Sequence, residues 1–317
     1  MIDSEETCSM LRKPLGDNPV SIRKYETKMF GKTMQRKVSV TVFYPSMSWE
    51  TEYPYKDPVW QKAAADSSDQ SLLDNVIHTF CGDGSASVSP MKETYPVVLF
   101  SHGLCGYEME NTVLCADIAS YGNVVVSIGH PKGSKILTHM DGSIWEDPEP
   151  FKKIRHKLDT VEPLWYEDFL ETIKLLEEMN RTDPLFKGRL DLSEMGIVGD
   201  SFGGCCGIAA VLKNEMLKYA VNLDGGLFVP MEYTFPDKPI LVLCNALNFL
   251  AHSALSRHKC TGVEVQKYKK IAHYEFSDGV YLGPRGKADR DWADKISHER
   301  SVRILDFINK VRSSQKQ

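Results

Sequence analysis

Residues 195–204 have the sequence MGIVGDSFGG, in which Gly199, Ser201 and Gly203 form a G-x-S-x-G pattern. An apolar run typical of a buried parallel strand comes before the pattern, and the apolar residues 205–212, which can form a helix, follow it. A serine on such a sharp strand-to-helix turn stands clear of both elements, because the flanking glycines remove side chains that would collide. The helix start also places N–H groups and a positive dipole end beside the serine. The pattern therefore predicts a nucleophilic serine and a serine hydrolase.

Strand-like and helix-like segments alternate on both sides of this turn. Buried strands are expected at 96–100, 124–128, 195–198, 219–223 and 239–244, and a half-exposed edge strand at 263–268. Helices are expected at 111–121, 162–179, 205–212 and 299–311. This alternation predicts an α/β fold with a mostly parallel central sheet and helices on both faces.

The first part of the chain has a different pattern. Residues 36–44 alternate as a half-buried antiparallel strand does, and Pro45 ends them. Residues 49–94 are rich in Ser, Asp, Pro and Tyr, with one helix expected near 72–80. We expect a single domain over residues 1–317 with an N-terminal antiparallel extension. Residues 132–162 form a candidate cap or pocket-mouth insertion within it.

The expected helix at 162–179 has an apolar stripe. Trp165, Phe169, Ile173 and Leu176 share one face, while other positions carry Asp168, Glu171, Lys174 and Glu178. A helix with one apolar stripe normally packs on a sheet, and that is our prediction. A lid, or a surface that faces a membrane, is the alternative.

Composition excludes some classes of function. The 317 residues carry a net charge of −5 with mixed signs, which gives no basic footprint for nucleic acid. The sequence has no basic and apolar signal segment at its start and no run of membrane-spanning length, so a cytoplasmic location is expected. The eight cysteines include no C-x-x-C pair and are expected to be mostly buried reduced thiols. Disulfides that involve Cys81 or Cys260 remain an alternative.

A serine nucleophile needs an acid that orients its histidine base, and in such folds the chain order is serine, acid, histidine. Asp224 directly follows the strand expected at 219–223, at the sheet edge where parallel sheets place their sites. The next strand ends in Asn245, which carries no charge, and Asp237 lies between proline and lysine in a surface turn. Asp224 is therefore the predicted acid.

Four histidines follow Ser201 in the chain. His273 comes after the last expected strand, in a loop that can lean over the sheet edge. His252 and His258 lie in a polar stretch, and His298 lies among charges in an expected helix, so these three suit solvated positions. His273 is the predicted base.

The tetrahedral intermediate of acyl transfer needs two backbone N–H donors. The amide of Phe202, directly after the nucleophile, supplies the first. The loop after the strand at 96–100 reads Ser101-His102-Gly103-Leu104-Cys105-Gly106, and its Leu104 amide supplies the second. His102 is interpreted as part of the loop scaffold. His130, at the end of another strand, could equally line the pocket or fill the core.

Other catalytic motifs are weak or absent. Residues 256–259 and 313–316 both match S-x-x-K, but neither has a strand–turn context. The sequence contains no H-E-x-x-H, no glycine-rich phosphate loop and no dinucleotide fingerprint. No cofactor and no metal are expected.

The chain resembles the platelet-activating-factor acetylhydrolase family of α/β-hydrolases. Four blocks carry the resemblance: Phe100-Ser101-His102-Gly103-Leu104, residues 197–204, Leu223-Asp224-Gly225, and Ala272-His273 near Phe276. The openings Pro19-Val20-Ser21-Ile22-Arg23 and Val42-Phe43-Tyr44-Pro45 are also similar. An aspartate directly after the strand that follows the elbow helix distinguishes this family, because many α/β-hydrolases carry the acid one strand later.

The resemblance implies an α/β-hydrolase with Ser201 as nucleophile, Asp224 as acid, His273 as base, and Leu104 and Phe202 at the oxyanion hole. It further implies a short-acyl or oxidised phospholipid, or another small ester, as substrate. The chain departs from the family at Asp200, where histidine is frequent, and at Cys105. Candidate pocket residues are His130, Cys105, Asp200 and Trp165.

These observations predict an enzyme that cleaves a carboxylic ester of a small or short-acyl substrate through a covalent acyl-enzyme. The same triad could serve an amidase, a lactonase, an acyltransferase or a cyclase. A binding module without catalysis is a remote alternative, because such modules normally lack a triad member. Contact with a membrane surface would fit a lipid substrate.

Overall fold

The computed structural model describes residues 11–48, 52–55, 78–145, 147, 149, 151–226, 238–249 and 262–315. Its strands are β1 (Val20–Glu26), β2 (Ser39–Pro45), β3 (Glu52–Pro54), β4 (His78–Gly82), β5 (Tyr95–Ser101), β6 (Val124–Gly129), β7 (Leu137–Thr138), β8 (Ile144–Trp145), β9 (Leu190–Asp200), β10 (Ala220–Leu223), β11 (Ile240–Cys244) and β12 (Val263–Lys267). Its helices are α2 (Thr112–Ser120), α3 (Phe151–Ile154), α4 (Leu158–Thr182), α5 (Ser201–Lys213), the 3-10 turn η3 (His273–Phe276), α7 (Gly279–Leu282), α8 (Pro284–Ala288) and α9 (Arg290–Gln315).

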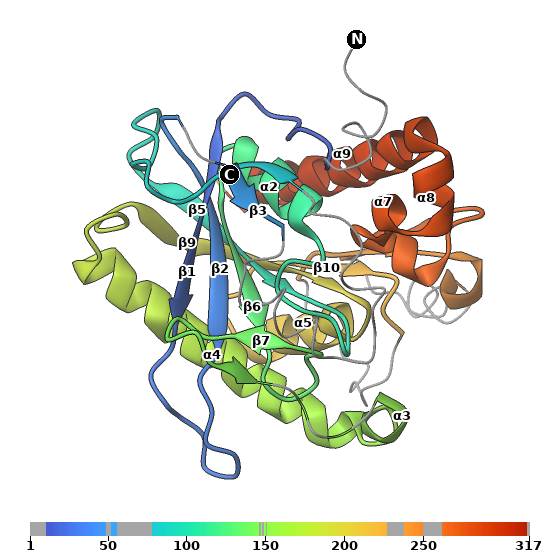
Figure 1. Ribbon diagram of the computed structural model, residues 1–317, viewed down its shortest axis with the longest axis horizontal. Helices are drawn as coiled ribbons and strands as arrows, with labels where there is room; N and C mark the ends of the chain where they lie inside the picture. Colours follow the sequence, from blue (N-terminus) through green and yellow to red (C-terminus); the bar gives the residue numbers. More distant parts are fainter. Residues whose placement is uncertain are drawn as a thin grey trace.

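A ten-stranded sheet runs through the described part of the chain, in the order β12-β11-β10-β9-β5-β6-β2-β1-β4-β3 (Figure 1). The six strands from β12 to β6 are parallel to one another. β2 pairs antiparallel with both β6 and β1, which gives the expected N-terminal antiparallel extension. The carboxyl ends of β5, β9 and β10 therefore meet at one edge of the sheet. From β5 the chain continues to β6 on one side of that strand, and it later returns as β9 on the other side. Such a switch point is where open α/β sheets place their sites.

Helices cover both faces of the sheet, as the alternation predicted. α4 and α5 pack over one apolar cluster, and α2 and α9 over another on the opposite face. Figure 1 shows the long helices α4 and α9 on opposite sides of the strands. The central strands are apolar on both faces because both are covered, which explains their continuous hydrophobic runs.

Some predicted elements differ from the observed ones in burial, type or bounds. β2 is completely buried, although its alternation predicted a half-buried strand, because apolar clusters lie on both of its faces. The helix expected near 72–80 is wrong at its end, since residues 78–80 belong to β4; its other residues lie outside the described ranges. α4 begins at Leu158 and not at Glu162, and α9 begins at Arg290 and not at Glu299.

The stripe on α4 is confirmed, with one exception. Its four apolar side chains are buried in the cluster between helix and sheet, so the helix packs on the sheet as predicted. Asp168, which was assigned to the outer face, is also completely buried. Arg36 Nε donates to Asp168 Oδ1 at 2.7 Å, and this buried ion pair makes the inward position tolerable. Burial raises the pKa of Asp168 to about 7, although the charge of Arg36 opposes the rise.

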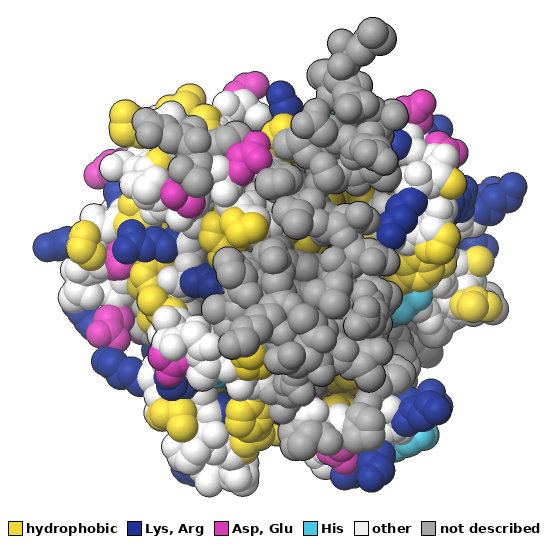
Figure 2. Space-filling view, viewed as in Figure 1, with side chains coloured by type: hydrophobic (Ala, Val, Ile, Leu, Met, Phe, Trp, Pro, Cys, Tyr) yellow, Lys and Arg dark blue, Asp and Glu magenta, His cyan; other side chains and the backbone are white. Residues whose placement is uncertain are grey.

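The surface agrees with the mixed composition. On the face shown in Figure 2, the Lys and Arg side chains of the described residues are scattered among Asp and Glu and form no continuous basic patch. None of the helices within the described ranges is long and apolar enough to cross a membrane. All six cysteines of the described part are free thiols, Cys81 included; Cys260 lies outside it.

The packing of β9 on its neighbour generates a stability prediction. A Cβ atom on Gly196 would overlap the ring of Tyr219, a side chain with no exposed surface. A Cβ on Gly207, inside α5, would meet Ile197 at an ordinary 3.4 Å. We expect Gly196→Ala to lower the free energy of unfolding by about 1–3 kcal/mol through overpacking. Gly207→Ala should change it by less than about 1 kcal/mol, because alanine favours the helix. Urea unfolding of both variants measures the difference, and equal effects would contradict this account of the packing.

Candidate active site

The strand β9 passes directly into the helix α5 at Ser201, which has a φ of +51°. A side chain in this left-handed region is strained and persists only where its surroundings hold it. Four non-glycine residues in the described ranges have a positive φ: Cys105, Ser201, Asp224 and Lys270. The first three are candidate site residues, so the backbone strain is concentrated where the sequence placed the chemistry.

Gly203 allows the helix start to approach the end of β5. A Cβ atom at this position would overlap the carbonyl oxygens of Ser101 and His102. The glycine pattern around Ser201 is therefore a requirement of space as well as of turn geometry. It brings the nucleophile's turn against the loop that follows β5.

The structure brings Ser201, His273 and Asp224 into one chain of hydrogen bonds. His273 Nε2 lies 2.8 Å from Ser201 Oγ, and His273 Nδ1 lies 2.7 Å from Asp224 Oδ2. The carboxylate can only accept, so it holds the proton on Nδ1 and leaves Nε2 free to accept from the serine hydroxyl. His273 begins the turn η3 and has a half-exposed side chain, while Asp224 is completely buried. This arrangement can remove a proton from Ser201.

Asn245 fixes the carboxylate of Asp224. Its backbone N–H donates to Asp224 Oδ1 at 2.7 Å, and its side-chain amide donates to Oδ2 at 2.8 Å. Asn248 donates to the Asp224 carbonyl oxygen at 2.9 Å. Sequence reasoning considered Asn245 only as a failed acid and missed this role. Its place at the end of β11, the parallel neighbour of β10, was the available signal.

His273 differs electrostatically from a free imidazole. The hydrogen bond to Asp224 raises the pKa of His273 most strongly, and the charges of Asp200 and Asp224 add to the rise. Burial acts in the opposite direction by disfavouring the charged ring. The acidic surroundings therefore favour the imidazolium that forms when the ring takes a proton.

The loop after β5 leaves one amide available. Gly103 N–H donates to Glu110 Oε1 at 2.6 Å, Cys105 N–H to Gly133 O at 2.6 Å, and Gly106 N–H to Gly103 O at 2.9 Å. The Leu104 N–H between them has no hydrogen-bond acceptor within the described part of the protein. The Phe202 N–H lies in the first turn of α5, where helix amides have no intrahelical partner. Both are suited to an incoming oxyanion.

His130 and Trp165 lie inside the core beneath this loop. His130 Nε2 is 2.9 Å from Ser101 Oγ, and His130 Nδ1 is 2.9 Å from Asp168 Oδ2. The Trp165 ring stacks on His130 with centroids 3.9 Å apart. Both side chains have no exposed surface, so they fill the core and do not line an open pocket. Burial, with a smaller contribution from Arg36, holds the pKa of His130 well below its ordinary value.

The remaining predicted residues are placed as follows. Cys105 is partly exposed beside Leu104, and burial raises the pKa of its thiol. Asp200 precedes the nucleophile and is only 7% exposed. His102 is buried, with its Nε2 2.8 Å from Ser134 Oγ, in agreement with a scaffold role. His298 is exposed on α9, and Asp237, His252 and His258 lie outside the described ranges.

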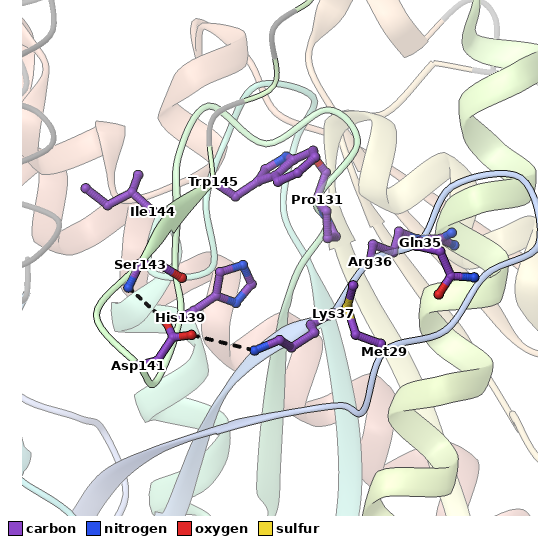
Figure 3. Close-up of a pocket in the computed structure, with 10 residues that line it drawn as sticks. All are labelled: Met29, Gln35, Arg36, Lys37, Pro131, His139, Asp141, Ser143, Ile144 and Trp145. Atoms are coloured by element: carbon purple, nitrogen blue, oxygen red, sulfur yellow. Dashed lines mark hydrogen bonds and ion pairs between the residues drawn. The ribbon is translucent and has the colours of Figure 1, made fainter.

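A cavity of about 230 Å³ lies away from these residues (Figure 3). Residues from the segments 29–37 and 131–145 line it, and His139 and Lys37 point toward its centre. None of Ser201, His273 and Asp224 belongs to its wall. Over the described ranges, no three His, Cys, Asp or Glu side chains gather as a metal site would require.

Comparison with known proteins confirms the resemblance seen in the sequence. Residues 6–162 match the family model described as platelet-activating factor acetylhydrolase, isoform II. The platelet-activating factor acetylhydrolase of Cavia porcellus is 22% identical over 92% of this chain and 77% of its own length. A probable 1-alkyl-2-acetylglycerophosphocholine esterase of Arthroderma benhamiae is 25% identical over 42% of this chain and 32% of its own length. The family match ends before Ser201.

A solved structure confirms the fold. The ferulic acid esterase from Streptomyces cinnamoneus aligns with a TM-score of 0.74 at 19% identity and covers 95% of this chain and 92% of its own. A dienelactone hydrolase-like phosphotriesterase aligns with a TM-score of 0.52 at 12% identity, over 89% of this chain and 98% of its own. The predicted α/β-hydrolase fold is therefore correct.

The geometry at His273 predicts a titration experiment. Because the hydrogen bond to Asp224 is the largest contribution that raises the pKa of His273, Asp224→Asn should lower that pKa. Nuclear magnetic resonance titration of the imidazole signals in both proteins measures the shift. The signals of exposed His298 serve as an internal reference. An unchanged His273 titration in a folded Asp224→Asn variant would show that the two side chains are not paired in solution.

Proposed function

We propose that this protein, an α/β-hydrolase that resembles the platelet-activating factor acetylhydrolase family, cleaves a carboxylic ester of a small or short-acyl substrate through an acyl-enzyme on Ser201. The observation that carries the proposal is the unbroken chain of hydrogen bonds from Ser201 through His273 to Asp224, at 2.8 and 2.7 Å. Backbone strain at two of its three members supports a functional use of this geometry.

The enzyme class follows from the family comparison. The chain is a carboxylic-ester hydrolase of the acetylhydrolase and esterase type. Relatives named for platelet-activating factor and for 1-alkyl-2-acetylglycerophosphocholine support a lipid that carries a short acyl chain as substrate. Two exposed apolar side chains close in sequence to residues of the site agree with such a substrate: Tyr274, which follows His273 and is 49% exposed, and Leu247, which lies two positions after Asn245 and is 85% exposed.

The first half of the reaction forms the acyl-enzyme. Ser201 Oγ attacks the ester carbonyl carbon while His273 Nε2 takes the hydroxyl proton. The carbonyl oxygen becomes an oxyanion, which accepts hydrogen bonds from the Leu104 and Phe202 amides. When the carbon–oxygen bond to the alcohol breaks, His273 returns its proton to the leaving oxygen. Asp224, held by Asn245, stabilises the transient imidazolium.

The second half releases the acid. A water molecule attacks the acyl carbon, and His273 takes one of its protons. The new tetrahedral intermediate uses the same two amides. Its collapse breaks the bond to Ser201 Oγ, which recovers a proton from His273. The half-exposed position of His273 gives water access to the base, which favours hydrolysis over transfer to another acceptor.

Substitution of the nucleophile tests the proposal. Ser201→Ala should lower kcat for p-nitrophenyl acetate by at least about 10⁴-fold, because no acyl-enzyme can form. With the wild-type protein, rates should fall steeply from acetyl to long-chain acyl esters if the acyl site is short. The rate of p-nitrophenol release across the series measures both effects.

A fluorophosphonate probe and a second substitution provide the controls. The probe should label the wild-type protein, label His273→Ala slowly, and leave Ser201→Ala unlabelled. If the probe labels Ser201 but no ester is hydrolysed, the proposed substrate would change to an amide or a lactone, or the reaction to transfer of the acyl group to an acceptor other than water. No labelling of the folded wild-type protein would overturn serine catalysis and favour a binding module.

A further inference from the structure

Two carboxyl groups flank Gly103, the residue before the Leu104 amide. Glu110 Oε1 accepts the Gly103 N–H at 2.6 Å. A Cβ atom on Gly103 would lie 3.2 Å from Asp200 Oδ2 and 3.4 Å from Glu110 Oε1, and also 3.2 Å from Ser201 Cβ. The two carboxyl groups therefore both lie beside Gly103, which separates Ser201 from the proposed oxyanion donor, the Leu104 amide.

Asp200 is poorly compensated for a buried charge. It is 7% exposed, and its Oδ1 has no hydrogen-bond partner within the described ranges. The charged groups around it are His273 on η3, Arg300 on α9, and Asp224 after β10. Arg300 acts on Asp200 through its charge, while its Nη1 donates to the carbonyl oxygens of Phe276 and Ser277.

Apart from backbone N–H groups such as that of Gly103, the groups that act on the Glu110 carboxyl are acidic or phenolic. Asp200 faces it from β9, Asp278 from the segment before α7, and Tyr107 from its own loop. The Asp278 carboxylate is satisfied, because it accepts the N–H groups of Thr112 and Val113 at 2.6 and 3.2 Å. No cation therefore neutralises Glu110 among the groups that act on it.

We propose that Glu110 and Asp200 are positioning residues that hold one proton between them, and that this singly charged pair fixes the Gly103–Leu104 loop and supports the charge of His273. The inference rests on the proposed function and adds a device that the triad does not contain. Geometry carries it, since two partly desolvated carboxyl groups beside one glycine repel each other strongly when both are ionised.

The directions of the pKa values agree. Burial, followed by the charge of Asp200, holds the pKa of Glu110 well above its ordinary value. Burial raises the pKa of Asp200 to about 7, against the opposing effect of His273. Because the charge of Asp200 raises the pKa of Glu110, ionisation of one carboxyl group opposes ionisation of the other, and the proposed proton belongs to the pair.

This pair has two consequences for catalysis. Its single negative charge favours the imidazolium of His273, because Asp200 raises the pKa of that ring. Loss of the shared proton at alkaline pH would place a second charge beside the developing oxyanion and pull against the Gly103 hydrogen bond. We therefore expect kcat of the wild-type protein to fall at alkaline pH as the pair becomes doubly charged.

The pH dependence of ester hydrolysis tests the pair. Asp200→Asn and Glu110→Gln each leave a single carboxyl group, so both should lose the alkaline fall in kcat.

The acid limb of the pH profile depends on His273, which must be neutral to act as base. Since Asp200 helps to raise the pKa of His273, Asp200→Asn should also move the acid limb to lower pH. Glu110→Gln should leave the acid limb near its wild-type position. Wild-type profiles for both variants would overturn the inference.

Removal of the hydrogen bond separates loop positioning from charge. Glu110→Ala deletes the acceptor of the Gly103 N–H, so kcat should fall about tenfold with little change in KM, as expected for a misplaced oxyanion donor. Glu110→Gln keeps an oxygen acceptor and should recover most of that loss. Equal kcat values for Glu110→Ala and the wild-type protein would overturn loop positioning. If Glu110→Ala fails to fold, the pH profiles of Asp200→Asn and Glu110→Gln, which keep the size of the side chains, test the inference.

Two further measurements keep the outcomes distinct. Glu162→Gln removes another buried carboxylate, which is paired with Lys213 and takes no part in the site, and should leave the pH profile unchanged. Infrared difference spectra of the wild-type protein against Asp200→Asn and Glu110→Gln should show a protonated-carboxyl band that both variants lose. A wild-type protein whose activity does not depend on Ser201 would refute the proposed function. A Ser201-dependent activity with neither the band nor the profile changes would refute the inference alone.

Discussion

The left-handed backbone at Ser201 is the constraint on which the rest of the site depends. A serine at a φ of +51° needs a buried strand on one side and a well-packed helix on the other to hold it. β9 and α5 supply these from the middle of the sheet, with covered faces on both sides. Because the start of α5 packs directly on the end of β5, the same packing sets the distance between Ser201 and the Gly103–Leu104 loop.

Acidic groups dominate this end of the sheet, and each is compensated in a different way. Asp224 is held by Asn245 and His273, and Asp278 by two amides at the start of α2. Asp168, beneath the site, is paired with Arg36 and connects to the end of β5 through His130. Glu110 accepts the Gly103 N–H but has no cation among the groups that act on it, and Asp200 Oδ1 has no hydrogen-bond partner within the described ranges. The proposed shared proton would lower the charge of this pair, and it would couple the oxyanion loop to the protonation state of the site.

Much of the fold could be predicted from local patterns. The continuous apolar runs gave β5, β6, β9, β10 and β11, and the stripe on residues 162–179 gave most of α4. Errors arose where tertiary contacts override a local pattern. β2 alternates polar and apolar residues but is covered on both faces, so Ser39 and Thr41 are buried as well. Asp168 has the polarity of a surface residue, and its burial depends on partners far away in the sequence: Arg36, 132 positions before it, and His130.

By itself the sequence determined the elbow serine, the chain order of the candidate triad and the strand ends that carry it, because each of these depends on residues that are adjacent along the chain. The tertiary structure alone decided what surrounds them. Asn245 contacts Asp224 because β10 and β11 are neighbours in the sheet, and Glu110 reaches Gly103 through an irregular loop with no periodic signal. His130 fills the core because α4 places Trp165 against it. Burial and charge compensation depend on groups that are distant in sequence, so a local sequence pattern does not predict them.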